Sequence, residues 1–422
     1  MIAVPRGRSS FAAGRGEAPG LPEVPLRMLP ALLAGMRRDR LGLLDRIRRD
    51  VGPIARVPLL GIVFVSDAAA AQEILRDTVS FPDKGIGLSA ARRYLGNGRL
   101  TATGAEWRHG HRRAAPFYTA QAMARMVASI GPALERSFSS VGPGPIALQP
   151  IIDRAIMTGL LTQLLGEDAA IRVDLEPILH DLRVLAMWSA RRLSPRPPGW
   201  TRLAWLLSWR ARQASRRLGD AIASWAGCHD GTLTELDGLD QASVRAETLT
   251  LLVAGLETSA ATAAFAVEAL SRSPRWADAI AVAGAGPLIA RQAVLETLRL
   301  HPPVWAITRR SSRAIAVAGQ KIRSGEQLLI SVHGLHRDPG IWDDPSLFDP
   351  DRFADGNPPA AFMPFGLGIR QCAGRQAGVG EATALIAWLF SRYRVEPIDP
   401  PADLEVGLAQ RPRHSRYRLT RR

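Results

Sequence analysis

The chain has 422 residues, enough for one large domain or two to three ordinary ones, and it can bury a core without disulfide bonds. Apolar residues make up 46% and charged residues 22%, a globular balance that excludes a disordered, collagen-like or fibrous protein. The net charge of +15 comes from arginine, since only Lys84 and Lys321 are lysines among 54 basic residues. The arginines are spread along the whole chain, so we expect a GC-rich bacterial gene and no nucleic-acid partner.

The N-terminal residues 1–20 are rich in Gly, Arg and Ser and lack a continuous apolar stretch. We expect a mobile tail there and no signal peptide. Residues 21–422 are interpreted as a single domain. No stretch reaches the roughly 20 apolar residues of a membrane span, and two cysteines do not make a disulfide framework. These features predict a soluble, cytoplasmic protein without a membrane span.

The first predicted elements form a small sheet region. Two β-rich runs between Ile54 and Ser66 flank Gly61 and predict a hairpin. Asp67 then stands where it can cap a helix over Ala68–Arg76. The pattern beyond it changes to helical.

From about residue 105 to 310 the sequence is largely helical, and a second β-rich region follows at Ala314–Val332. A final helix is predicted over Ala377–Phe390. Together the elements predict a mainly α fold with minor β sheets at both ends of the chain. Breaks in the helical region are expected at Gly142–Pro145, Ser194–Gly199 and Gly231–Gly238.

One helical stretch, Leu251–Ser259, is almost uncharged and is expected to be buried. Thr258 is four residues after Ala254, so its hydroxyl can bond that carbonyl and bend the helix, and Gly255 would ease the bend. Glu257 and Thr258 would then supply proton-relay groups in an apolar setting. The alternative is a core helix with one satisfied glutamate.

Two pairs of residues are spaced to meet on one face of a helix. Glu296 and Arg299 form an i,i+3 acid–base pair, which alone is usually a solvated contact. Trp107 and His111 stand four residues apart, so both project from the same face.

A glycine-rich loop, Phe365–Gly374, surrounds Cys372. Its glycines let the backbone turn tightly and bring amide groups close to the sulfur. The following helix and Arg370 are expected to favour a thiolate, and a thiolate in such a loop suits an axial haem ligand. The alternative is a buried structural cysteine, the interpretation given to Cys228.

Together these motifs resemble the cytochrome P450 haem-thiolate monooxygenases. The cysteine loop matches the family signature Phe-x-x-Gly-x-Arg-x-Cys-x-Gly at every defined position, and Ala254–Thr258 is similar to the family's oxygen-activating helix motif. Glu296 and Arg299 match the Glu-x-x-Arg motif, which Arg352 of Pro350–Phe353 would join as a structural partner, with Asp351 where Glu is usual. The resemblance runs from about residue 50 to the C-terminus.

The resemblance implies the cytochrome P450 fold, with a long central helix over a haem b group and the cysteine loop on the opposite face. Cys372 would be the axial metal ligand. His111 stands where the family commonly has arginine, so its help to a haem propionate becomes pH-dependent. Arg310 would replace Arg309 if the register slips by one. The implied cofactor-binding residues are Trp107, His111, Arg309, Arg370, Phe365, Gly366, Gly374, Ala254 and Gly255.

The implied function is a bacterial monooxygenase of secondary metabolism. It would activate O2 with two electrons and insert one oxygen atom into a hydrophobic small molecule, with Thr258 and Glu257 as catalytic residues. Because no flavin or nicotinamide fingerprint occurs, the electrons are expected from a ferredoxin with an NAD(P)H-dependent ferredoxin reductase. A peroxide-driven peroxygenase and a non-catalytic haem sensor are the alternatives, and Glu257 with Thr258 counts against both.

The substrate is predicted from apolar positions that line the family's pocket. They are residues 86–100, 251–255, 304–307 and 406–408. The run from Pro302 to Arg310 is similar to that of some bacterial terpenoid oxidases, which favours a terpenoid. Fatty acids, steroids and polyketides remain open.

Overall fold

The computed structural model describes residues 20–28, 30, 32, 34–35, 39–139, 144–191, 208–225, 230–236, 240–282, 286–407, 409–413 and 415–422. Residues 1–19 of the predicted tail, the break at Ser194–Gly199, Cys228 and Leu408 lie outside the described residues.

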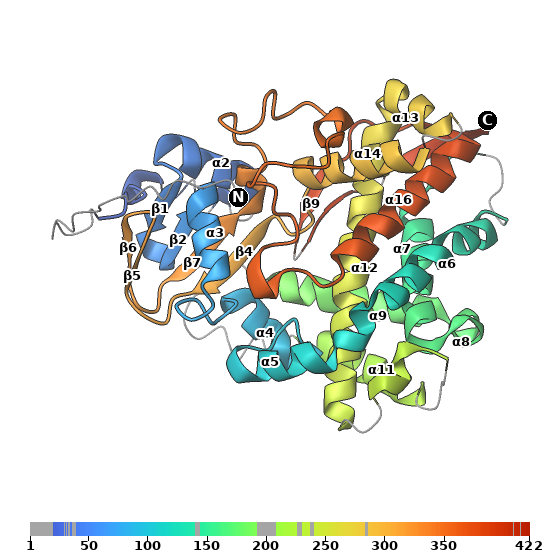
Figure 1. Cartoon of the computed structure of the whole chain (residues 1–422), viewed down its shortest axis with the longest axis horizontal. Coiled ribbons are helices and arrows are strands. Elements are labelled where there is room, and N and C mark those ends of the chain that lie inside the picture. The colour runs from blue at the N-terminus through green and yellow to red at the C-terminus, as the bar shows by residue number, and fades with distance from the viewer. Residues whose placement is uncertain are drawn as a thin grey trace, which may run out of the picture.

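The described chain is mainly helical, as predicted, with the strands of residues 54–65 and 306–331 gathered on one side and most of the helices on the other (Figure 1). Helix α12 runs through the helical part and is the longest helix described. The helices are α2 (Arg40–Asp50), α3 (Ala68–Arg76), α4 (Ile86–Leu95), α5 (Gly104–Arg113), α6 (Ala120–Phe138), α7 (Gln149–Leu165), α8 (Glu167–Arg172), α9 (Leu175–Arg191), α11 (Trp209–Ser224), α12 (Gln241–Ser271), α13 (Pro274–Ala281), α14 (Gly286–Leu300), α15 (Val332–Leu335) and α16 (Arg375–Arg392).

The largest sheet has the order β1-β2-β7-β4, with β2 and β7 parallel and the other pairs antiparallel. A second antiparallel sheet has the order β3-β11-β8, and β5–β6 and β9–β10 form two-stranded ribbons. The strands are β1 (Ile54–Val57), β2 (Ile62–Val65), β3 (Ile146–Ala147), β4 (Ala306–Arg310), β5 (Ile315–Val317), β6 (Gln320–Ile322), β7 (Gln327–Ser331), β8 (Tyr393–Pro397), β9 (Leu404–Val406), β10 (Gln410–Pro412) and β11 (Arg416–Arg421).

The local predictions at the first sheet are confirmed. Strands β1 and β2 form the expected hairpin, and Gly61 takes the left-handed conformation at its turn, with φ 59°. Asp67 caps α3 by accepting a hydrogen bond from the Ala70 amide at 2.8 Å. The second β-rich region holds β5, β6 and β7, and the final helix is α16.

The prediction of helix up to about residue 310 is wrong at its end. Helix α14 stops at Leu300, and residues 306–310 form β4 against β7. Pro302 and Pro303 explain the difference, since neither can donate a backbone hydrogen bond and each disfavours helix in the residue before it.

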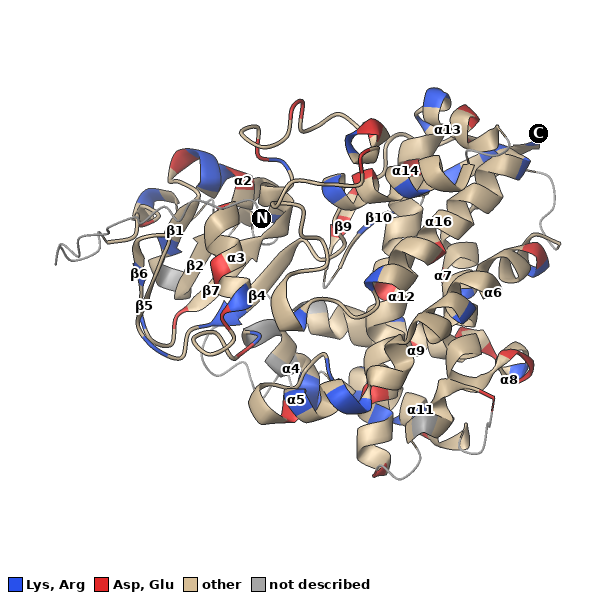
Figure 2. Cartoon of the chain, in the orientation of Figure 1, with Lys and Arg blue, Asp and Glu red and all other residues tan. Residues whose placement is uncertain are grey.

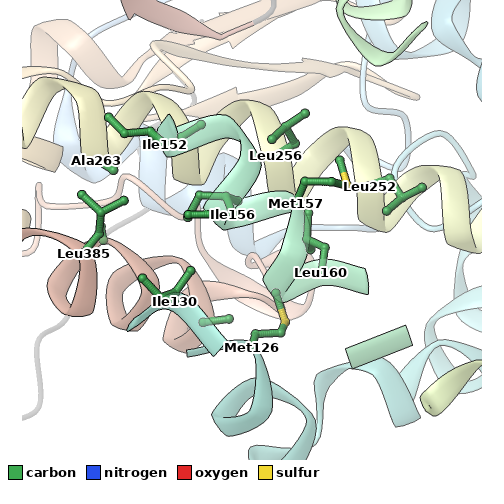
Figure 3. Packing of buried hydrophobic residues seen from close by; sticks show 14 of the residues in the cluster. Met126, Ile130, Ile152, Ile156, Met157, Leu160, Leu252, Leu256, Ala263 and Leu385 are labelled. Carbon is green, nitrogen blue, oxygen red and sulfur yellow. The ribbon is translucent and has the colours of Figure 1, made fainter. Parts of the chain in front are cut away.

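Helix α12 lies between α7 and α16 and is apolar on all sides, as a core helix must be. By length and composition it could span a membrane, but 78% of its most apolar window is buried within the protein. Figure 3 shows Ile156 and Leu160 of α7 packed among Leu252 and Leu256 of α12, with Leu385 of α16 nearby. These contacts fix the position of α12 relative to α16.

The Glu296–Arg299 pair is wholly buried, not solvated. Arg299 has 0% exposure, and each of its five N–H groups has an acceptor. Two of them bind the Glu296 carboxylate at 2.7 and 2.8 Å. The other three bind the carbonyls of His336, Pro345 and Leu347 at 2.8–2.9 Å. The pair therefore ties α14 to the long connection that follows α15.

Glu296 has two further partners in that connection. Its Oε1 accepts a hydrogen bond from the Asp349 amide at 2.9 Å. It also lies 3.5 Å from Arg352 Nε, so the expected second arginine does join the pair as an ion-pair partner.

His336 carries this connection on to the cysteine loop. The Met363 amide donates to His336 Nε2 at 3.0 Å, and His336 Nδ1 lies 3.2 Å from the Arg299 carbonyl. An acceptor at Nε2 requires a neutral ring with its proton on Nδ1. Burial lowers the pKa of His336 to about 3, so this form persists at neutral pH. The Arg299 helix and the start of the cysteine loop are thereby joined through one imidazole.

Replacing Arg299 by lysine should destabilise the protein strongly. Lysine has three N–H groups where arginine has five, so two or more buried acceptors would lose their partner. We expect the free energy of unfolding to fall by about 3–5 kcal/mol, measured by urea titration followed by circular dichroism. Arg92→Lys is the control, because its pair with Glu106 is exposed, and it should cost less than about 1 kcal/mol. Equal losses in the two variants would contradict the structural role of Arg299.

Candidate functional site

The cysteine loop is held in a tight turn. Gly366 and Gly368 have φ of 68° and 73°, a conformation that favours glycine. A Cβ on Gly368 would lie 2.8 Å from the Leu75 carbonyl oxygen, so the loop also passes very close to α3. The Cys372 amide donates to the Phe365 carbonyl at 2.9 Å. This closed loop places Cys372 just before Gly374, the N-cap of α16.

The Cys372 side chain is exposed, yet the surrounding protein desolvates its thiol and raises its pKa. Both observations hold if the sulfur is accessible from one side and enclosed by protein on the others. The Gly374 amide and the charge of Arg99 oppose the shift without overcoming it. The expectation that the loop by itself favours a thiolate is therefore wrong. Coordination of a metal ion would remove the proton.

One short strip of α12 is accessible within an otherwise buried stretch. Between Ala246 and Val267 every residue is buried except Ala254, Gly255, Glu257 and Thr258. The Thr258 hydroxyl donates to the Ala254 carbonyl at 2.7 Å, which confirms the predicted hydrogen bond. A Cβ on Gly255 would lie 2.7 Å from Leu160 Cδ2, so this glycine permits close packing of α7 against α12.

Glu257 does not lie in the apolar setting that was expected. Burial is the main cause that raises the pKa of its carboxyl group, and the positive charges of Arg411 and Arg183 oppose it. The negative charge of Asp153 adds to the increase. A carboxyl group with a raised pKa can hold and release a proton closer to neutral pH than an ordinary glutamate can.

Three of the predicted cofactor-binding residues carry buried nitrogen atoms without a hydrogen-bond partner among the described residues. These atoms are His111 Nδ1, Arg309 Nε, and Nε and Nη1 of Arg370. Trp107 lies between two of them: its ring stacks on His111 with 5.0 Å between centroids and lies 5.2 Å from the Arg370 guanidinium carbon. Unpaired buried donors are costly, so this group of side chains fits an anionic ligand.

Arg309 and not Arg310 belongs to this group. Arg309 is buried, and its burial lowers its pKa to about 10 with a further contribution from the positive charge of Arg370. Arg310 is exposed. Burial also lowers the pKa of His111, so its imidazole is neutral at pH 7 and can only donate or accept a hydrogen bond.

Lys84 and Arg99 join the group and were missed by sequence reasoning. Lys84 Nζ donates to the carbonyls of Arg99 and Leu100 at 2.5 and 2.9 Å. The pKa of Lys84 is lowered to about 7, mainly by burial and in smaller part by the charges of Arg370, Arg309 and Arg99. The rarity of lysine in this chain was the one available signal, but no motif marked the position.

The charges of this cluster leave a positive excess. Lys84, Arg99, Arg309 and Arg370 act on one another electrostatically, and the acidic groups acting on them are Glu247 and Asp83. Glu247 accepts a hydrogen bond from the Arg99 amide at 3.1 Å. Arg108 acts on Arg370 and Arg113 on Glu247, so the cations outnumber the two carboxylates. The carboxylates of a bound anionic ligand would offset this positive excess.

A buried carboxylic acid, Glu381, lies on α16, the helix that follows the cysteine loop, and was also missed. It is fully buried on α16, its side chain bonds Ser259 of α12, and its Oε1 has no partner among the described residues. Burial raises its pKa to about 8. Nothing in its spacing distinguishes it from a surface glutamate.

Replacing Glu381 by glutamine should change how stability depends on pH. The folded state binds this proton more tightly than the unfolded state, so the wild type loses stability as pH rises from about 4.5 to about 8. The slope from this group approaches about 1.4 kcal/mol per pH unit. Glu381→Gln should remove it, so the variant gains on the wild type as pH rises through this window in urea titrations. Parallel curves for the two proteins would contradict the burial of an uncharged acid.

The comparisons with known proteins agree with this site. The family model described as Cytochrome P450 matches residues 288–417, which include Glu296, Arg309 and Cys372. The chain is 27% identical to cyclooctatin synthase of Streptomyces melanosporofaciens over 375 residues, 78% of this chain and 79% of that protein. It is 24% identical to cyclooctat-9-en-7-ol 5-monooxygenase of the same organism over 363 residues, 77% of this chain and 79% of that protein.

Pentalenene oxygenase of Streptomyces avermitilis is 30% identical over 210 residues, 44% of this chain and 45% of that protein. Taken with the two longer matches, this similarity confirms the predicted resemblance and the mainly α fold that goes with it.

Proposed function

We propose, from the membership of this chain in the cytochrome P450 family, that it inserts one atom of O2 into a hydrophobic small molecule. The family makes the chain a haem-thiolate monooxygenase. Further parts of the proposal are a haem b cofactor, a single catalytic domain over residues 21–422 and a cytoplasmic location.

The observation that carries the proposal is the combination of an accessible Cys372 thiol with the unpaired buried donors of His111, Arg309 and Arg370. Cys372 would ligate the iron, and the donors would hold the two propionates. When bound, the haem supplies the redox chemistry that activates O2.

The remaining contacts of the cofactor follow from the same geometry. Lys84 and Arg99 would complete the charge balance at the propionates, and Trp107 would pack beside them. Phe365, Gly366 and Gly374 would line the cysteine side. Ala254 and Gly255 belong to the accessible strip of α12 and would lie on the other side.

Glu257 and Thr258 are proposed to deliver protons. The Thr258 hydroxyl gives its proton to the Ala254 carbonyl, so its oxygen keeps lone pairs that can accept a hydrogen bond from water. A water held there can receive a proton from the neighbouring Glu257. This pair supports the use of O2, and it favours neither peroxide-driven oxidation nor a haem sensor.

The substrate class is proposed from the relatives of this chain. The relatives named for cyclooctatin and pentalenene support a terpenoid substrate.

Electrons would come from a ferredoxin with an NAD(P)H-dependent ferredoxin reductase. Arg112 and Arg113 are exposed at the end of α5, whose arginine positions are blue in the ribbon of Figure 2, and Arg375 is exposed at the start of α16. Such cations would steer an acidic ferredoxin to the cysteine side.

Replacing Cys372 by histidine tests the proposed ligand. The reduced carbon monoxide complex of the wild type should show the long-wavelength Soret band that a thiolate ligand gives, and Cys372→His should abolish it. Cys228→Ser is the control and should keep the band. A variant at Cys372 that retains the band would overturn the assignment.

Replacing Thr258 by alanine tests the proton delivery. Folding and haem content should be unchanged, while the product formed per NAD(P)H falls by at least about tenfold and hydrogen peroxide is released instead. Thr262→Ala is a matched control, because its hydroxyl makes the same type of bond one turn later, to the Thr258 carbonyl, in a buried position. Full coupling in Thr258→Ala would show that Thr258 is a core residue.

A further inference from the structure

Residues 96–102, here called the Arg99 loop, connect α4 to α5 and carry Arg99 to the proposed haem site. The charge of Arg99 acts on both Cys372 and His111. Its guanidinium carbon lies 5.0 Å from the centre of the Tyr118 ring. In the part of the chain that the structure describes, no oxygen accepts a hydrogen bond from this guanidinium. Its donors are therefore available to an anionic ligand.

The backbone of Arg99 is held on both sides by charged side chains. The Arg99 amide donates to Glu247 Oε2 of α12 at 3.1 Å. The Arg99 carbonyl accepts from Lys84 Nζ, which also binds the Leu100 carbonyl. Because Glu247 is only 4% exposed, water competes little for its contact with the amide. The two contacts together fix the direction in which the Arg99 side chain leaves the backbone.

Close packing brings this backbone within reach of α12. A Cβ on Gly98 would lie 2.4 Å from both the Ala246 carbonyl oxygen and the Thr250 hydroxyl oxygen. Only glycine permits such an approach. Since Gly98 immediately precedes Arg99, the approach places the Arg99 amide beside Glu247.

Glu247 also lies close to α5, since a Cβ on Gly110 would be 2.9 Å from Glu247 Oε1. Burial raises the pKa of its carboxyl group, while the bond to the Arg99 amide and the charges of Arg99, Lys84 and Arg113 oppose the increase. By its charge alone, Glu247 would weaken the binding of an anionic ligand. A benefit to such a ligand can therefore come only from the contacts that Glu247 makes.

We propose that Glu247 is a positioning residue that, together with Lys84, fixes the Arg99 backbone so that the Arg99 guanidinium binds a haem propionate. The inference rests on the proposed haem-thiolate function, which gives Glu247 no role of its own. Without Glu247, Arg99 would turn away from the site although the site becomes more positive. Haem retention would then fall, whereas a purely electrostatic role of Glu247 would make it rise.

The test compares Glu247→Ala with Glu247→Gln in the haem-loaded ferric protein. Glutamine keeps an acceptor oxygen for the Arg99 amide and removes only the charge, whereas alanine removes both. We expect haem transfer to excess apomyoglobin to be about tenfold faster in Glu247→Ala than in the wild type, because a buried hydrogen bond is lost. Transfer from Glu247→Gln should be no faster than from the wild type. Equal rates in the two variants would overturn the inference.

A double-mutant cycle tests whether Glu247 acts through Arg99. Arg99→Gln keeps the backbone amide and should speed haem transfer about as much as Glu247→Ala. Adding Glu247→Ala to Arg99→Gln should then change the rate little further, because the two residues act as a unit. Additive effects would contradict the proposal. An unchanged rate in Arg99→Gln alone would also contradict it, even if Glu247→Ala does not fold.

Hydrogen–deuterium exchange of the Arg99 amide reports the contact directly, without haem loss or turnover. In the haem-loaded protein it should be at least about tenfold faster in Glu247→Ala and close to the wild-type rate in Glu247→Gln. Unchanged exchange in Glu247→Ala would show that the amide does not depend on this carboxylate.

Glu268→Ala is the matched control. Glu268 lies near the other end of α12, is 13% exposed and also accepts a backbone hydrogen bond, from the Ala402 amide at 3.3 Å. Its loss should leave haem transfer and Arg99 exchange unchanged. If Glu268→Ala speeds haem transfer as much as Glu247→Ala does, the inference is overturned. The Cys372 variants decide haem ligation separately, so failure of the proposed function is distinguishable from failure of this inference.

Discussion

The arrangement of the site depends on one buried ion pair, Glu296 with Arg299. A guanidinium removed from water is stable only when its N–H groups are all paired, and here the pairing partners are carbonyls that lie 37 to 48 residues further along the chain. Because these carbonyls must reach the buried Arg299 to pair its N–H groups, the connection after α15 has to fold back against α14. His336 then extends the same requirement to Met363, two residues before the cysteine loop begins.

The cluster formed by Lys84, Arg99, Arg309 and Arg370 is arranged in the opposite way, without partners for all of its charges. Its members are placed so that they do not satisfy one another, and the lowered pKa values of Lys84, Arg309 and Arg370 record the resulting repulsion and desolvation. Such an arrangement costs stability in the protein alone and gains it back when an anion is bound. A site organised in this way couples the binding of an anion to folding. At the proposed cofactor site, His111 would take part through hydrogen bonding, and Lys84 would add positive charge beside the arginines.

Much of the fold could be predicted because its signals are local. The hairpin around Gly61, the cap at Asp67 and helix α16 follow from neighbouring residues. The cysteine loop could be found because its glycines and its cysteine are consecutive. Lys84, Arg99 and Glu381 could not, because their importance arises from burial and from partners that only the tertiary structure brings near. The thiolate expectation failed for the same reason, since desolvation of Cys372 is not visible in its sequence neighbours.

The contact between Gly255 and Leu160 has a consequence for protein engineering. Gly255 lies on the accessible strip of α12, where a larger residue would be an obvious way to reshape the proposed substrate space, but its Cβ would meet a leucine of α7. A side chain at 255 therefore requires Leu160 to move or to be replaced by a smaller residue. Libraries that vary one position at a time would miss every such combination, so these two positions should be randomised together.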